Sequence, residues 1–201
     1  MIKNIVFDYG AVLIDWNPHY LYDPYFGDRA KADRFLGEIC TLEWNTTLDG
    51  GRPFHEACLE KAAQYPEFKE PIMMYETGWR KMVNGEIPGM LDVVKTLKDK
   101  GYKIYGLTNW SAETFPWVRE TFPIFTLLEG MVVSGEEFLL KPGPEIYNLL
   151  LERYGLKAGE CVFIDDNPAN AEGARRVGMK GLVFRGADTV LDDLAPILAE
   201  E

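Results

Sequence analysis

The sequence is poor in cysteine, in basic residues and in long apolar runs, and each shortage excludes a class of protein. Its three cysteines, Cys40, Cys58 and Cys161, lie far apart and form no CxxC pair, so neither a disulfide framework nor a zinc site is predicted. Lys and Arg number 21 against 32 Asp and Glu, a net charge of −11. This balance disfavours a nucleic-acid partner, whose phosphates need basic side chains for neutralisation. No apolar run approaches the roughly 18 to 20 residues of a membrane helix, so no membrane association is expected.

The remaining bulk properties favour a cytoplasmic globular protein. The first apolar segment begins within a few residues of Met1, which leaves no room for a signal peptide. Hydrophobic residues make up 47% of the chain, so intrinsic disorder is not expected. A chain of 201 residues can form one full core, or a core domain with a smaller inserted one.

Short apolar runs alternate with helical patterns along most of the chain. Such alternation is typical of parallel βαβ units and predicts an α/β fold with a Rossmann-like, doubly wound parallel sheet. The predicted strands are residues 5–7, 104–107, 131–133, 162–164 and 182–184. The predicted helices cover residues 87–97, 144–154 and 169–177, with Pro near the start of the first two and Gly just after the end of each.

One long segment interrupts the alternation. Residues 16–86 contain no pattern of a buried strand, but residues 35–39, 57–63 and 72–82 have helical patterns, with a turn-rich patch at 45–51. The segment is too long for a loop within a compact domain. We therefore expect an inserted, all-helical cap at residues 16–86 and a core made of residues 1–15 and 87–201.

Acidic side chains follow two of the predicted strands. Asp8 comes directly after the first strand, and Asp165 and Asp166 end the fourth. Ligands of open parallel sheets bind at the carboxyl ends of the strands, and three carboxylates gathered there would repel one another unless a hard divalent cation joined them. A Mg²⁺ ion between Asp8 and Asp166 would do so. Taken singly, however, an Asp in the position of Asp8 is usually a turn residue or a helix cap, and the pair Asp165 and Asp166 equally suits a solvated loop that caps a helix.

Hydroxyl, amide and ammonium groups occupy similar positions. Thr108 and Asn109 follow the second predicted strand, where they could bind phosphate oxygens or could cap the next helix. Lys141 stands directly before the run Pro142-Gly143-Pro144. A surface lysine is the ordinary interpretation, but a lysine held in that way opposite three acids could balance their charge.

Taken together, these four segments resemble the motifs of the haloacid dehalogenase-like (HAD) hydrolase superfamily. The first motif is similar to residues 7–13 (FDYGAVL), the second to 107–109 (LTN), the third to 141–142 (KP) and the fourth to 164–170 (IDDNPAN). The resemblance spans the whole chain, and the insertion between the first two motifs is similar to the helical cap of such enzymes.

The resemblance implies a role for each matching residue. Asp8 would be the nucleophile that forms an aspartyl-phosphate, Thr108 would bind the transferring phosphoryl group, and Lys141 would neutralise both. Mg²⁺ would be coordinated by Asp8, the carbonyl of Gly10 and Asp166, and supported by Asp165, with Asn170 behind them. The implied substrate is a small phosphorylated metabolite.

Gly10 departs from the usual phosphatase pattern, which has a second Asp at this position as general acid and base. Loss of such a group costs roughly 10²- to 10⁴-fold in rate, although this Asp-x-Gly form resembles that of glucose-1-phosphate phosphatases. Two alternatives follow. One is a metal-independent 2-haloacid dehalogenase, which needs no acid; the other is a catalytically weak member that binds a phosphorylated ligand or a protein. The pair Asp165 and Asp166 favours the metal-dependent phosphatase, because two extra carboxylates would repel a haloacid.

Substrate contacts are expected from Asn109 and Gly10 in the core and from Trp44 and Asn45 in the cap. Aromatic faces beside polar groups suit a sugar phosphate, although tryptophan more often packs in a core. Further candidates in or near the cap are Trp16, Arg52, His55 and Trp110.

Overall fold

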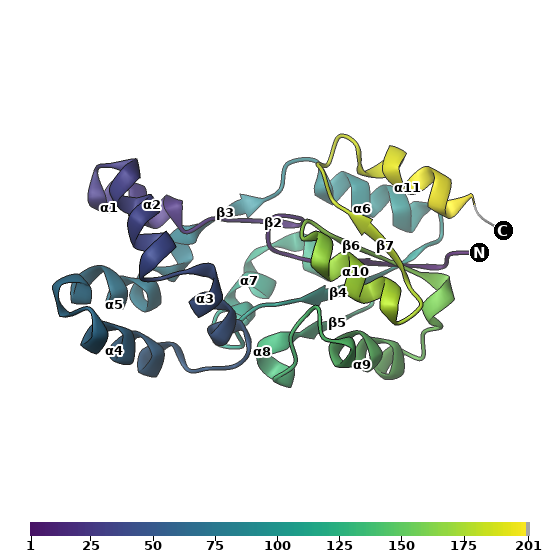
Figure 1. Cartoon of the computed structure of the whole chain (residues 1–201). Helices are drawn as coiled ribbons and strands as arrows, with labels where there is room; N and C mark the ends of the chain where they lie inside the picture. The colour runs from purple at the N-terminus through teal and green to yellow at the C-terminus, as the bar shows by residue number, and fades with distance from the viewer. Residues whose placement is uncertain (200–201) are drawn as a thin grey trace.

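A computed structural model describes residues 1–199 and contains a five-stranded parallel sheet. The strand order is β5-β4-β1-β6-β7, so β1 lies at the centre (Figure 1). The strands are β1 Asn4–Phe7, β4 Lys103–Thr108, β5 Gly130–Val133, β6 Cys161–Asp165 and β7 Lys180–Val183. All five predicted strands are confirmed. The last begins two residues earlier than expected and is only partly buried, because it forms an edge of the sheet.

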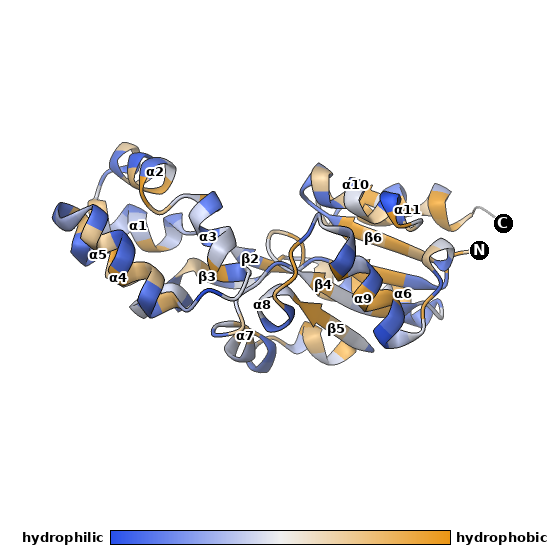
Figure 2. Ribbon diagram, turned by 60° about the horizontal axis from the view of Figure 1, so that its bottom comes forward, coloured by the Kyte–Doolittle hydropathy of each residue, from blue (hydrophilic) through white to orange (hydrophobic). Residues whose placement is uncertain are grey.

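Helices cover both faces of this sheet, and the alternation of side chains along β1 shows why. Ile5 and Phe7 pack with Met90 and Leu194 on one face, whereas Val6 packs with Ile146 and other residues on the other. A strand covered on both sides must be apolar at every position, and Figure 2 shows the strands in orange between bluer helices. The core helices are α6 Met90–Asp99, α7 Phe115–Thr121, α8 Ser134–Glu137, α9 Pro144–Tyr154, α10 Pro168–Arg176 and α11 Val190–Leu198, with 3-10 turns η3 Pro123–Leu127 and η4 Ala158–Glu160.

Five helices form the cap that stands beyond the carboxyl end of the sheet (Figure 1). They are α1 His19–Phe26, α2 Arg29–Glu38, α3 Leu42–Asp49, α4 Phe54–Gln64 and α5 Lys69–Thr77, with 3-10 turns η1 Pro66–Phe68 and η2 Trp79–Met82. The three predicted helical segments lie in α2, α4 and α5 with η2. The prediction of a turn-rich patch at 45–51 is wrong, since most of these residues belong to α3. This helix is capped by Thr41, whose hydroxyl accepts a hydrogen bond from the Trp44 amide at 3.1 Å.

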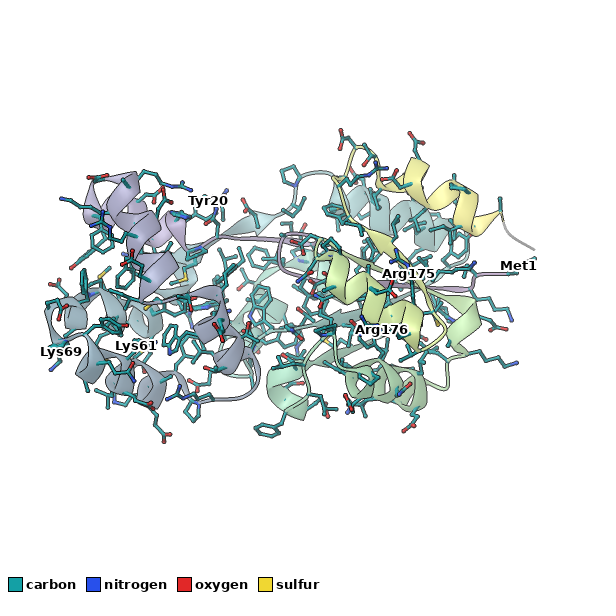
Figure 3. The ribbon with its side chains drawn as sticks, viewed as in Figure 1. Met1, Tyr20, Lys61, Lys69, Arg175 and Arg176 are labelled. Atoms are coloured by element: carbon teal, nitrogen blue, oxygen red, sulfur yellow. The ribbon has the colours of Figure 1, made fainter. Side chains whose placement is uncertain are left out.

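A short antiparallel ribbon, which sequence patterns did not predict, joins cap and core. It consists of β2 Ile14–Trp16 and β3 Val83–Glu86, at the two points where the chain passes between them. Asp15 holds the ribbon to α1, because its carboxylate accepts hydrogen bonds from the Tyr20 hydroxyl at 2.8 Å and the Asn84 amide at 3.1 Å. Figure 3 shows Tyr20 beside this ribbon. Both strands are short and mostly half-buried, so they leave no apolar run in the sequence.

Residues 200 and 201, the end of the predicted core range 87–201, lie outside the described residues. Within residues 1–199, no helix has both the length and the apolar character needed to cross a lipid bilayer.

Candidate functional site

The candidate site lies at the carboxyl ends of the three middle strands. Asp8 follows β1, Thr108 ends β4 and Asp165 ends β6. Because β1 pairs in parallel with both β4 and β6, these ends meet at one edge of the sheet. The amide of Asp8 continues the pairing, since it donates to the carbonyl of Ile164 at 2.9 Å, and so fixes where the Asp8 side chain starts.

A buried lysine joins the two strand-end acids. The Nζ of Lys141 lies 2.8 Å from Asp8 Oδ1 and 2.6 Å from Asp165 Oδ2, and it also donates to the Leu107 carbonyl at 3.2 Å. The Lys141 side chain is fully buried. Its three hydrogen-bond donors are therefore all used within the protein.

Burial and neighbouring charges act in opposite directions on the pKa values of Asp8 and Lys141. Burial and the neighbouring charge of Asp165 raise the pKa of Asp8 to about 7, whereas Lys141 lowers it. Burial lowers the pKa of Lys141, but the two carboxylates beside it raise the pKa by more. Lys141 therefore stays cationic and favours the ionised form of Asp8.

Asp165 is held by more partners than either of the other two acids. Besides Lys141, its carboxylate accepts hydrogen bonds from the Asn167 amide at 2.8 Å and from the Asn170 side chain at 3.1 and 3.0 Å. Asn167 in turn caps α10, accepting from the amide of Ala169 at 2.9 Å. The sequence from 165 to 170 thus forms a rigid strand-to-helix turn around one carboxylate.

Asn109 and Thr108 occupy different surroundings. The side chain of Asn109 pairs with the backbone of Lys141 in both directions, donating to its carbonyl at 3.0 Å and accepting from its amide at 2.9 Å. This pair ties the loop after β4 to the loop that carries the lysine. Thr108 is fully buried, and among residues 1–199 its hydroxyl has one weak partner, the Asn109 carbonyl at 3.4 Å.

The three acids form a set of oxygen donors suited to a hard cation. Oxygen atoms of Asp8, Asp165 and Asp166 all lie within 4.8 Å of one another. Partial desolvation of its carboxylate in the site and the charge of Asp165 raise the pKa of Asp166. Carboxylates this close are the ligands that Mg²⁺ prefers, so the residues present fit this ion.

A cavity of about 370 Å³ lies over this edge, between core and cap. The core side is lined by Gly10, Ala11, Asn109, Trp110, Asp166, Asn167 and Asn170, and the cap side by Trp16, Leu42, Asn45, Thr46, Asp49 and Trp79. Of the two predicted cap residues, Asn45 lines the cavity. Trp44 does not; it is buried within the cap, where its ring meets that of Tyr75 edge-on at 4.9 Å.

The other cap candidates also differ in position. Trp16 and Trp110 line the cavity, whereas Arg52 pairs with Glu60 and the exposed His55 pairs with Glu76. Sequence patterns missed Asp49, because its helix was not recognised. Once α3 is known, the four-residue spacing from Asn45 places both on one helix face.

Comparison with known proteins found a matching family and several similar chains. Residues 63–178, more than half of the chain, match the haloacid dehalogenase-like hydrolase family. A sesquiterpene phosphatase of Aspergillus oryzae is 28% identical over 182 residues, which cover 90% of this chain and 88% of that protein. A D-ribitol-5-phosphate phosphatase of Bacteroides thetaiotaomicron is 25% identical, with 90% of each chain covered.

Among solved structures, a HAD family enzyme of Bacteroides thetaiotaomicron in complex with magnesium and inorganic phosphate superimposes with a TM-score of 0.73. The two chains are 21% identical, and the match covers 92% of this chain and 96% of the other. This likeness shows the fold. With the family match over residues 63–178, it leads to one conclusion: the chain belongs to the haloacid dehalogenase-like hydrolases.

Proposed function

We propose that this hydrolase is a Mg²⁺-dependent phosphatase that acts on a small phosphorylated metabolite through an aspartyl-phosphate on Asp8. The observation that carries the proposal is the contact of Asp8 with the buried Lys141 beside two further acids, Asp165 and Asp166. The fixed ammonium of Lys141 favours the ionised form of the Asp8 carboxylate, which is the form that can attack phosphorus. A cation at the acids would offset the charge of the incoming phosphate.

Each core residue has a proposed task. Asp8 is the nucleophile, Lys141 orients it and neutralises developing charge, and the hydroxyl of Thr108 binds the transferring phosphoryl group. Asn109 positions Lys141 through its two backbone hydrogen bonds. In a first step the Asp8 carboxylate bonds to phosphorus and the ester oxygen leaves; in a second, water displaces Asp8 and releases phosphate.

The metal would be held by Asp8, Asp166 and the Gly10 carbonyl. When bound, Mg²⁺ supplies positive charge that polarises the phosphoryl group and lowers repulsion between it and the acids. Asp165 has its hydrogen bonds to Lys141 and Asn170, so we assign it to holding the site together rather than to direct coordination.

The cap is proposed to select the substrate. We place it at residues 16–86, with the core at 1–15 and 87–201, so that the boundaries fall at the β2–β3 ribbon. Three tryptophans of the cavity, Trp16, Trp79 and Trp110, offer flat apolar faces, while Asn45 offers an amide. Such walls suit a sugar ring or a larger apolar group, in keeping with relatives named for ribitol phosphate and sesquiterpene substrates.

Two features of the site weigh against the two alternatives: the acid pair Asp165 and Asp166, and the contact of Asp8 with Lys141. A metal-free dehalogenase would bring the carboxylate of a haloacid next to Asp165 and Asp166, where it would be repelled. A binding protein without turnover would have no use for the costly burial of Asp8 and Lys141 together.

The test is release of phosphate from an aryl phosphate, with Mg²⁺ and with EDTA, beside release of chloride from 2-chloropropionate. We expect phosphate release that needs Mg²⁺ and is lost in Asp8→Asn, with the fold retained by circular dichroism. Chloride release that is indifferent to EDTA would support the dehalogenase instead. An Asp8→Asn variant as active as the parent would refute the nucleophile assignment.

A further inference from the structure

The proposed phosphatase needs a proton donor that the first motif does not provide. Gly10 stands where a second Asp would act, and it has no side chain. Among the core residues near it, Lys141 has all its donors engaged and Asp165 accepts several hydrogen bonds. Asn109 and Asn170 carry amides, which do not ionise near neutral pH and so cannot act as general acids. An acid from another part of the chain is therefore required.

Asp49 reaches the same cavity from the cap. It is the last residue of α3, the cap helix nearest to the core in Figure 1, and it lines the cavity together with Gly10 and Asp166. Its backbone carbonyl accepts a hydrogen bond from the Ser134 hydroxyl of α8 at 2.5 Å. This contact joins the end of α3 to the core, so the position of Asp49 over the strand ends is fixed.

The carboxyl group of Asp49 is held in one orientation. Its Oδ2 accepts a hydrogen bond from the Asn45 side chain at 2.9 Å, and the backbone of Ser111 also bonds to it. Asn45 is oriented in turn by Tyr75, whose hydroxyl donates to Asn45 Oδ1 at 2.8 Å. Two oriented partners on one carboxyl, facing a cavity, are an arrangement found for groups that act on a substrate.

The charge state of Asp49 suits proton transfer near neutral pH. Burial raises its pKa to about 7, and Lys141 and the Ser111 backbone act in the opposite direction. The other titratable groups nearby are Tyr75, whose pKa is raised in part by Asp49, and Asp166 across the cavity. A general acid works best when its pKa is close to the working pH.

We propose that Asp49 is the general acid and base of this enzyme and takes the role that Gly10 cannot fill. The proposal rests on the phosphatase function argued above. As the bond from phosphorus to the ester oxygen breaks, the carboxyl proton of Asp49 passes to that oxygen, and the alcohol leaves. In the second step the Asp49 carboxylate takes a proton from the attacking water, while the bond from phosphorus to Asp8 breaks. Phosphate is then released, and free Asp8 and protonated Asp49 are restored.

This arrangement makes turnover depend on the cap. An acid at the Gly10 position would belong to the core, whereas Asp49 is brought by α3 and is in place only while α3 rests against α8. Substrate recognition and proton supply would then come from the same helix, since Asn45, Thr46 and Asp49 all line the cavity.

The decisive experiment compares two substrates that differ in their need for an acid. The leaving group of p-nitrophenyl phosphate, p-nitrophenolate, departs without a proton. The leaving group of glycerol 2-phosphate is an alkoxide, which needs a proton in order to depart. For Asp49→Asn we expect kcat on glycerol 2-phosphate to fall about 10²- to 10⁴-fold, with a much smaller loss on p-nitrophenyl phosphate. In the parent, kcat/KM for the alkyl ester should fall as pH rises past neutrality, because Asp49 loses its proton. This fall should be absent in Asp49→Asn.

The matched control is Glu43→Gln, which alters an exposed carboxylate in the first turn of the same helix and should change neither substrate. An equal loss on both substrates, or a higher KM with kcat unchanged, would overturn the proposal in favour of a structural or binding role. If the parent enzyme released phosphate from neither ester, the phosphatase function itself would fail, and the acid assignment with it.

Discussion

An ionisable carboxyl whose pKa is raised by folding lowers stability at high pH, and Asp49 provides a direct test of this. Burial raises the pKa of Asp49 from its ordinary value of 3.8 to about 7 in the folded protein. At pH values below the lower pKa, both the folded and the unfolded chain hold the proton, so the carboxyl does not change the free energy of unfolding. Between the two values the unfolded chain ionises first and is favoured, so the free energy of unfolding falls as pH rises. Above about 7 the penalty is complete.

The magnitude follows from that shift. Between about pH 5 and about pH 8 a shift of this size lowers the free energy of unfolding by at most about 2.5 kcal/mol. Because the Asp49 carboxyl faces the cavity, water there screens its charge, and we expect about 1 to 2 kcal/mol. The side chain of Asp49→Asn cannot ionise. The free energy of unfolding of the variant, relative to the parent, should therefore rise by this amount from the lower to the higher pH.

The assay is urea denaturation of parent and variant, followed by tryptophan fluorescence, in buffer free of Mg²⁺. The difference between the two pH values matters rather than either alone, because the amide also changes the hydrogen bonds to Asn45 and Ser111 by an amount that does not vary with pH. Glu43→Gln should show no such gain. If parent and Asp49→Asn lost stability equally between the two pH values, folding would not raise the pKa of the half-buried Asp49 carboxyl, and this reasoning would be refuted.

Three further outcomes are expected. Asp166→Ala should raise the Mg²⁺ concentration needed for half-maximal phosphate release, and an unchanged requirement would move the metal elsewhere. Lys141→Met removes the cation between two buried carboxylates and should cost about 3 to 5 kcal/mol in urea denaturation. The same change at the exposed Lys3, paired to Glu160 at 2.9 Å, should cost less than about 1 kcal/mol in the same test. A Cβ at Gly135 would lie 2.7 Å from a backbone oxygen of the loop after β4, so Gly135→Ala should lower stability by about 1 to 3 kcal/mol. At Gly10 the nearest atom is 3.7 Å away, and Gly10→Ala should leave the melting temperature nearly unchanged.

The centre of the sheet was predictable because its strands are buried on both faces. A strand such as Val162–Ile164 has to be apolar throughout, and that run is visible without any knowledge of its neighbours. The ribbon of β2 and β3 was not predictable, since its half-buried strands carry no such run. The helix α3 was missed because Asn, Thr, Asp and Gly between 45 and 51 favour turns when taken alone. Capping by Thr41 and burial of Leu48 outweigh those preferences.

Within the candidate site, the sequence by itself determined which groups end the strands. Asp8, Thr108 and Asp165 follow apolar runs, and parallel strands bring such ends to one edge. Only the tertiary structure decided that Lys141 contacts both acids and that Asp49 lines the same cavity. These contacts join residues far apart in the chain, and their existence depends on how loops and the cap pack, which local patterns of charge and hydrophobicity do not encode.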